Sequence, residues 1–243
     1  MKGSDVGEKD GLLGDLSFAI TAAHELKSPL ALIRQLSLAL EAGDNLSDRE
    51  KERILRQITL VSERALRLTA DLSRTTRLDD SLFKLEPLNP QQICEEVAHE
   101  LTPLFRAKGR TIRVASRYRP ILAVANRDLL RRIMINFADN ALHYAGDGEA
   151  VELHAVTREK GVRIRLGVRD YGPAVPLNIW QTIETSLGTG KQALHARPQS
   201  SGLGLYVAGQ FARAMQGQVG ATRHRDGATF YVDIAASAQL RLL

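Results

Sequence analysis

The strongest constraint on the fold is a pair of apolar stripes in the first 75 residues. In each stripe apolar residues recur three and then four positions apart, which places them on one face of a helix. The members are Leu16, Ala19, Ala23, Leu26, Leu30, Ile33 and Leu40, followed by Ile54, Ile58, Val61, Ala65, Leu68 and Leu72. Turn-forming residues at 42–46 separate the stripes, and Ser47-Asp48-Arg49-Glu50 has the form of a capping box. The sequence therefore predicts a long helical hairpin.

This hairpin carries more apolar residues than two helices can bury. Helices of about 30 residues would be about 45 Å long. Leu32, Leu36, Leu55 and Leu66 fall outside the two stripes. Two hairpins paired as a four-helix bundle would bury them, so we expect a homodimer. The alternative is a monomeric hairpin that packs on a second domain.

The rest of the chain has an alternating pattern of helices and strands. Two prolines in Glu86-Pro87-Leu88-Asn89-Pro90 end the helical pattern, so we place a domain boundary between residues 10–86 and 87–243. We predict helices near 90–108, 127–143 and 203–216, and strands near 110–116, 120–125, 150–158, 161–169, 218–225 and 227–235, with an irregular stretch before residue 203. Turns at 159–161 and 226–227 join antiparallel strands. The fold class is therefore α+β, a mixed sheet with helices on one face.

Composition excludes several classes of function. There is no apolar run of the roughly 18 residues that a membrane span needs, and no export signal at the N-terminus. We therefore expect a cytoplasmic chain with no membrane contact of its own. Residues 87–243 carry 20 Lys and Arg against 13 Asp and Glu. No helix-turn-helix or aromatic platform accompanies this charge, so we expect no nucleic acid as a partner. A bound polyphosphate nucleotide would explain the basic excess as well.

His24 is a candidate nucleophile on the first helix. Ala23 and Leu26 belong to the apolar stripe, which leaves His24 turned toward solvent. Neutral imidazole can attack an electrophile at physiological pH, and the adjacent Glu25 can orient the ring and take up a proton. Pro29 should bend the helix just beyond this pair. A lone histidine on a helix is more often an ordinary solvated side chain, so the neighbours carry this interpretation.

Three downstream segments combine residues suited to a nucleotide site. Asn136 and Asn140 lie one helical turn apart, and an amide oxygen is a reasonable ligand for magnesium. Asp170 ends a strand and is followed by Gly172. Gly202-Leu203-Gly204 opens a helix whose N–H groups could approach phosphate oxygens. Each segment also has an ordinary interpretation: a hydrogen-bonded amide pair, a turn former and a flexible helix start.

Taken in order, these segments resemble the catalytic core of the two-component sensor histidine kinases, from about residue 12 to about residue 235. The resemblance implies a dimerisation and histidine-phosphotransfer domain followed by an ATP-binding domain with the GHKL, or Bergerat, fold. It implies ATP and Mg²⁺ as cofactors, autophosphorylation, and transfer of the phosphoryl group to an aspartate of a response-regulator receiver domain. In this family a membrane-anchored sensor portion often precedes such a core.

The resemblance also implies roles for individual residues. In the hairpin, His24 would be phosphorylated with Glu25 as general base, and Ser28 would stand where the family commonly has a threonine or asparagine that assists response-regulator dephosphorylation. In the second domain, Asn140 would hold the metal. The remaining residues implied in nucleotide binding are Asn136, His143, Tyr144, Asp170, Gly172, Lys191, Arg197, Gly202, Leu203 and Gly204. For Lys191 and Arg197 the sequence favours a solvated loop charge over a role in nucleotide binding.

Two departures from the family pattern keep other functions open. Ala174 replaces a second glycine after Asp170, and Ile179-Trp180-Gln181-Thr182-Ile183 lacks the expected paired phenylalanines. These departures support a nucleotide-binding pseudokinase scaffold as an alternative, but such a scaffold would need neither His24-Glu25 nor Asn140. A GHKL ATPase of the chaperone or mismatch-repair kind would also use the asparagine and glycine segments, but it leaves the histidine helix unexplained.

Overall fold

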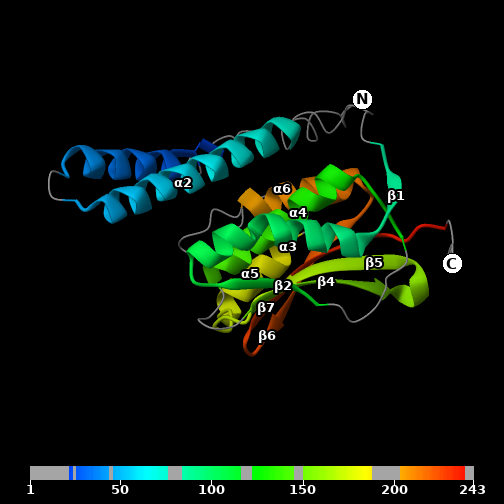
Figure 1. The fold of residues 1–243 in the computed structure, drawn as a ribbon. Helices are drawn as coiled ribbons and strands as arrows, with labels where there is room; N and C mark the ends of the chain where they lie inside the picture. Colours follow the sequence, from blue (N-terminus) through cyan, green and yellow to red (C-terminus); the bar gives the residue numbers. More distant parts are fainter. Residues whose placement is uncertain are drawn as a thin grey trace, which may run out of the picture. The chain divides into compact units, whose positions relative to one another are not determined.

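The structure is a computed structural model, and it describes residues 22–23, 26–43, 46–75, 84–115, 122–144, 150–187 and 203–238. The chain divides into two compact units, Met1–Arg77 and Leu78–Leu243. The first unit is helical and the second combines helices with a sheet (Figure 1). Among the helices in the described ranges, none is both long enough and apolar enough to cross a membrane.

The helical unit contains both predicted helices. Residues 26–41 are helical, and helix α2 runs from Asp48 to Thr75. The capping box is confirmed at the start of α2: the Ser47 N–H donates to Glu50 Oε2 at 2.9 Å, and the Glu50 N–H donates to Ser47 Oγ at 3.3 Å. The hydrogen bonds from Ser47 also lower the pKa of the Glu50 carboxyl. The local sequence thus determines where α2 begins.

The second unit is built on a mixed five-stranded sheet, as predicted. Its strand order is β2-β4-β5-β7-β6, with β2 parallel to β4 and every other neighbouring pair antiparallel. The strands are β2 (Thr111–Val114), β4 (Ala150–Arg158), β5 (Arg163–Arg169), β6 (Gln218–His224) and β7 (Gly227–Ala235). In β5 the alternating Ile164, Leu166 and Val168 are buried, which places Arg163, Arg165 and Arg169 on the opposite face.

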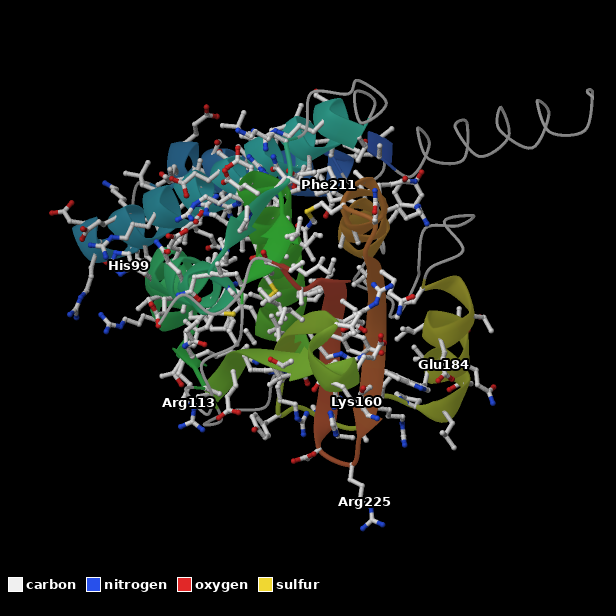
Figure 2. All side chains as sticks on the ribbon, turned by 90° about the vertical axis from the view of Figure 1, so that its right-hand side faces the viewer. His99, Arg113, Lys160, Glu184, Phe211 and Arg225 are labelled. Atoms are coloured by element: carbon white, nitrogen blue, oxygen red, sulfur yellow. The ribbon has the colours of Figure 1, made fainter. Side chains whose placement is uncertain are left out.

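Three helices cover one face of this sheet, namely α3 (Pro90–Ala107), α4 (Arg127–Tyr144) and α6 (Leu203–Ala214) (Figure 1). Each contributes a fully buried phenylalanine to the core, Phe105, Phe137 and Phe211 respectively. The Phe137 ring packs against Phe230 of β7, with 6.2 Å between the ring centroids. In Figure 2 Phe211 lies in the helix layer, while Arg225 projects from a hairpin tip. The predicted placement of the helices is therefore confirmed.

Two elements differ from the sequence expectations. Strand β1 (Glu86–Leu88) pairs antiparallel with β3 (Ala123–Ala125), although prolines led us to expect only a break there. Glu86, the last residue of the predicted helical domain, pairs with Ala125. Helix α5 (Leu177–Ser186) occupies part of the stretch predicted to be irregular. Trp180 and Ile183 of α5 are buried, so a helical spacing was present in a segment too short to be distinctive.

Candidate nucleotide-binding site

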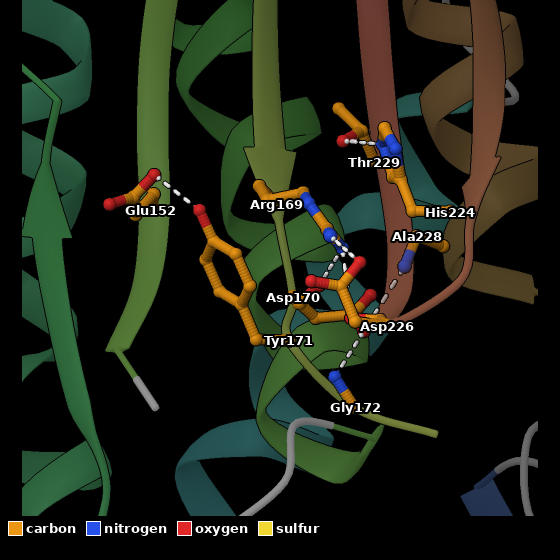
Figure 3. Close-up of polar contacts among 9 residues, drawn as sticks. All are labelled: Glu152, Arg169, Asp170, Tyr171, Gly172, His224, Asp226, Ala228 and Thr229. Atoms are coloured by element: carbon orange, nitrogen blue, oxygen red, sulfur yellow. Dashed lines mark hydrogen bonds and ion pairs between the residues drawn. The ribbon is translucent and has the colours of Figure 1, made fainter. Parts of the chain in front are cut away.

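Asp170 supplies a buried carboxylate to the candidate site. It follows β5 and is only 4% exposed. Its Oδ1 accepts hydrogen bonds from the N–H groups of Gly172 at 3.2 Å and Ala228 at 3.3 Å (Figure 3). Its own N–H donates to the Ala228 carbonyl at 3.0 Å. Backbone donors from two segments therefore hold this carboxylate in one orientation.

Gly227 makes this arrangement possible. Its φ of +122° lies in a region that favours glycine. A Cβ at Gly227 would collide with the Asp170 carbonyl oxygen and would lie 2.5 Å from Asp170 Oδ1. The β6–β7 hairpin can approach Asp170 only because this position has no side chain.

Arg169 also holds this segment in place. Its Nη1 donates to the Asp170 carbonyl oxygen, and its Nη2 donates to Asp226 Oδ1 at 2.5 Å (Figure 3). The guanidinium carbon lies 4.3 Å from the centre of the Tyr171 ring, whose hydroxyl donates to Glu152 at 2.9 Å. The hydrogen bond from Arg169 lowers the pKa of the Asp226 carboxyl. Burial, followed by the bond to Glu152, raises the pKa of Tyr171.

Helices α4 and α6 bring two other predicted residues together. A Cβ added to Gly204, near the start of α6, would lie 3.8 Å from the Cβ and Cγ atoms of Asn136 in α4. The Asn136 Nδ2 atom is buried and has no hydrogen-bond partner among the described residues. Leaving such a group unsatisfied costs about 1–3 kcal/mol. The amide is therefore suited to meet a polar ligand at the start of α6.

The described ranges contain only part of the predicted site. The residues found in the elements expected for them are Asn136, Asn140, Asp170, Gly172, Leu203 and Gly204. Ser28 lies in the helix of residues 26–41 and is exposed. The backbone of His143 and Tyr144 belongs to the last turn of α4. The predicted residues that lie outside the described residues are His24, Glu25, Lys191, Arg197 and Gly202. The functional roles of all these residues stay predictions.

Sequence reasoning missed the residues that hold Asp170. Arg169 and Ala228 belong to no recognisable motif, and the Asp226-Gly227 pair suggested only a hairpin turn. The turn signal identified the glycine, but its contact with Asp170 bridges 57 positions of sequence. Only the pairing of β5 with β7 brings the two residues together.

The family comparison covers this site. Residues 125–238 match the family model described as histidine kinase-, DNA gyrase B-, and HSP90-like ATPase. The matched segment, just under half of the chain, includes α4, the strands around Asp170, and α6.

Individual relatives match over a longer stretch. The sensor histidine kinase YcbM of Bacillus subtilis is 24% identical over 197 residues, which cover 80% of this chain and 63% of YcbM. The sensor protein kinase PmrB of Pseudomonas aeruginosa is 30% identical over 217 residues, covering 88% of this chain and 43% of PmrB. The chain thus spans less than two thirds of either relative.

The fold has a solved counterpart as well. The crystal structure of full-length ShkA in complex with AMPPNP matches with a TM-score of 0.58 and 22% sequence identity. This match covers 91% of this chain and 46% of that chain. At this identity the likeness concerns the fold alone.

Proposed function

We propose that this chain carries the catalytic region of a two-component sensor histidine kinase, binds ATP and phosphorylates itself on His24. The phosphoryl group would then pass to an aspartate of a response-regulator receiver domain. The observation that carries this proposal is the unpartnered Asn136 amide beside Gly204, within the segment that matches the ATPase family.

Asp170 would recognise the adenine base. Its carboxylate is buried and held by backbone donors, so it can accept a hydrogen bond from the adenine amino group without reorganising. Gly172, the next glycine along, is buried and would allow the backbone to approach the base. The complex of ShkA with AMPPNP supports an adenine nucleotide as the ligand of this fold.

Asn140 would hold magnesium, with Asn136 one turn away in α4. Within the described ranges no group of three or more His, Cys, Asp and Glu side chains could hold an ion. An amide oxygen is a suitable ligand for an ion that keeps most of its waters and also binds phosphates. Bound Mg²⁺ would offset the charge of the β- and γ-phosphates. The helix start at 202–204 would also contact the nucleotide. Four further residues would do the same, namely His143, Tyr144, Lys191 and Arg197.

The phosphotransfer step would need few groups. Glu25 would accept the proton from the His24 imidazole as the ring nitrogen bonds to the γ-phosphorus, and the bond to the ADP oxygen would break. Ser28 is exposed on the helix of residues 26–41. Its hydroxyl could later orient a water against the response regulator's phosphoaspartate, which would give a phosphatase activity.

The helical unit would act as a homodimer through residues 10–86, with residues 87–243 as the ATP-binding domain. Leu30, Leu55 and Leu66 are 59%, 55% and 70% exposed in the single chain, a large apolar surface for two helices. A second hairpin would cover these side chains in a four-helix bundle. We place this region in the cytoplasm. A membrane-anchored sensor portion could precede it.

The test is incubation of the protein with γ-labelled ATP. Acid-labile, base-stable label that disappears in His24→Gln, with nucleotide binding retained, would support the proposal. Asp170→Asn keeps an oxygen acceptor for the backbone donors but loses the charge, and should weaken ATP binding in the folded protein. Nucleotide binding without any label would identify a pseudokinase scaffold, which Ala174 favours. Phosphate release without label would identify a simple ATPase.

A further inference from the structure

Asn126 lies between β3 and α4, and its side chain makes hydrogen bonds in two directions. Its Oδ1 accepts the N–H of Leu129 in the first turn of α4 at 3.1 Å. Its Nδ2 donates to the carbonyl oxygen of Lys84 at 3.2 Å. A backbone N–H can only donate and a carbonyl can only accept, so these partners determine the orientation of the amide. The side chain caps α4 and at the same time holds Lys84.

The backbone of Asn126 reaches a second helix. Its N–H points at the sulfur of Met215, at 3.3 Å, directly after the end of α6. Met215 is 1% exposed, so this contact lies in the core. One residue therefore contacts the beginning of α4 and the end of α6. These are the helices that bring Asn136 and Gly204 together.

Lys84 lies two residues before β1 (Glu86–Leu88), the first strand of the ATPase unit. Beyond Lys84 the chain enters β1, where Glu86 pairs with Ala125, the residue just before Asn126. Two contacts therefore hold the entering segment at the junction of β3 and α4. One is the pairing of β1 with β3, and the other is the hydrogen bond from the Asn126 side chain to Lys84. Asn136 lies ten positions further along α4, about 15 Å away on a stiff helix.

We infer that Asn126 is a positioning residue that couples the segment entering the ATPase unit to the helices of the nucleotide site. A displacement of Lys84 is passed through the Asn126 amide to the start of α4, and along the helix to Asn136 and Asn140. The coupling is reciprocal, because nucleotide bound at α4 must favour the same position of the entering segment. This inference rests on the proposed function in taking α4 and α6 as the helices that hold the nucleotide, and in its autophosphorylation readout.

Two substitutions separate the cap from the connection to Lys84. Asn126→Asp keeps the cap, and its charge suits a helix N-terminus, but it turns a carboxylate oxygen toward the Lys84 carbonyl. Asn126→Ser also keeps a capping oxygen but is too short to reach Lys84. The matched control is Asn89→Asp, because Asn89 caps α3 through Gln91 at 3.0 Å directly after β1.

The experiment measures hydrogen exchange and autophosphorylation in the full chain. In both Asn126 variants, hydrogen exchange at the Glu86 and Leu88 amides should become about tenfold faster, because one hydrogen bond is lost. The amides of α4 should stay protected, because both variants keep the cap. Mg-ATP should slow exchange in β1 of the unaltered chain and have no such effect in the variants. ATP affinity should stay within about twofold, and the autophosphorylation rate should fall about fivefold or more. Asn89→Asp should change none of these.

Several results would overturn the inference. Unchanged exchange in β1 would mean that the Lys84 contact holds nothing in place. Faster exchange with unchanged nucleotide-dependent protection would mean that the contact is structural and uncoupled from the site. A large loss of ATP affinity would make Asn126 a direct part of the binding site. If the unaltered chain takes up no label, the proposed function fails, whereas the nucleotide-dependent protection of β1 still decides the coupling.

Discussion

The imidazole of His154 on β4 lies against Gly167 on β5, in the space where a side chain would otherwise be. A Cβ at Gly167 would come within 2.6 Å of His154 Nε2, and the two residues are direct partners across the strand pair. Burial, with further contributions from Arg165 and Arg158, lowers the pKa of His154, although Glu152 acts in the opposite direction. Burial on the sheet therefore disfavours the protonated form of the ring.

This burial predicts a pH-dependent stability. The unfolded chain binds a proton at His154 with a pKa of about 6.5, above the folded value, so the stabilisation is complete above that pH and is lost as pH falls below it. Replacing His154 with Gln should therefore reduce the fall in melting temperature between pH 7.5 and pH 5.5. His99 is exposed on α3, and His99→Gln is the control. An equal pH dependence in all three proteins would contradict the prediction.

Gly227→Ala should damage both stability and nucleotide binding. The positive φ alone should cost about 1–2 kcal/mol for an L side chain, and the collision with Asp170 should add to it. Gly161→Ala is the matched control, since Gly161 also has a positive φ, +98°, but nothing lies within 4 Å of an added Cβ. Urea unfolding should show a larger loss for Gly227→Ala. Calorimetry should show weakened ATP binding in that variant alone.

Periodicity located most of the second unit from sequence because each long element buries one face. Helix α4 and strand β7 both lie within a residue of the predicted ranges. Strand β1 was missed because three residues including Pro87 carry no period, and only pairing with distant β3 makes them a strand. Helix α5 was missed because its 10 residues follow a turn-rich segment and bury few side chains.

The candidate site was predictable to the extent that single residues have a local signature. Asn136 and Asn140 were identifiable from their helical spacing, and Asp170 from its place at a strand end. The contacts that hold these residues depend on long-range packing, so neither the hydrogen bond of Asn126 to Lys84 nor the unpartnered amide of Asn136 could be read from the sequence.

The buried amide of Asn136 leads to a prediction in which one substitution raises the stability of the unliganded protein and lowers its affinity for ATP. Asn136→Leu replaces a buried, unsatisfied group with an apolar side chain of similar shape, so the free energy of unfolding without ligand should rise by about 1 kcal/mol. ATP affinity should fall because the donor beside Gly204 is gone. Thermal unfolding with and without Mg-ATP measures both effects. A destabilised apo protein would show that Asn136 is already satisfied without a ligand.

The last prediction concerns the apolar surface of α2. Leu55 and Leu66 are 11 positions apart, close to three helical turns, so they lie on one face of α2, and both are largely exposed in the single chain. If a second hairpin covers this face, the double variant Leu55→Lys, Leu66→Lys places two charges inside the dimer and should separate it. Neither side chain is buried in the single chain, so the helix itself should persist, with unchanged helical content by circular dichroism.

The control is Gln57→Lys, which adds a charge at an exposed polar position of the same helix and should leave the dimer intact. Light scattering at micromolar concentration would measure the oligomeric state of each protein. An unaltered chain that is monomeric, or a double variant that remains dimeric, would show that this face of α2 is not the dimer interface.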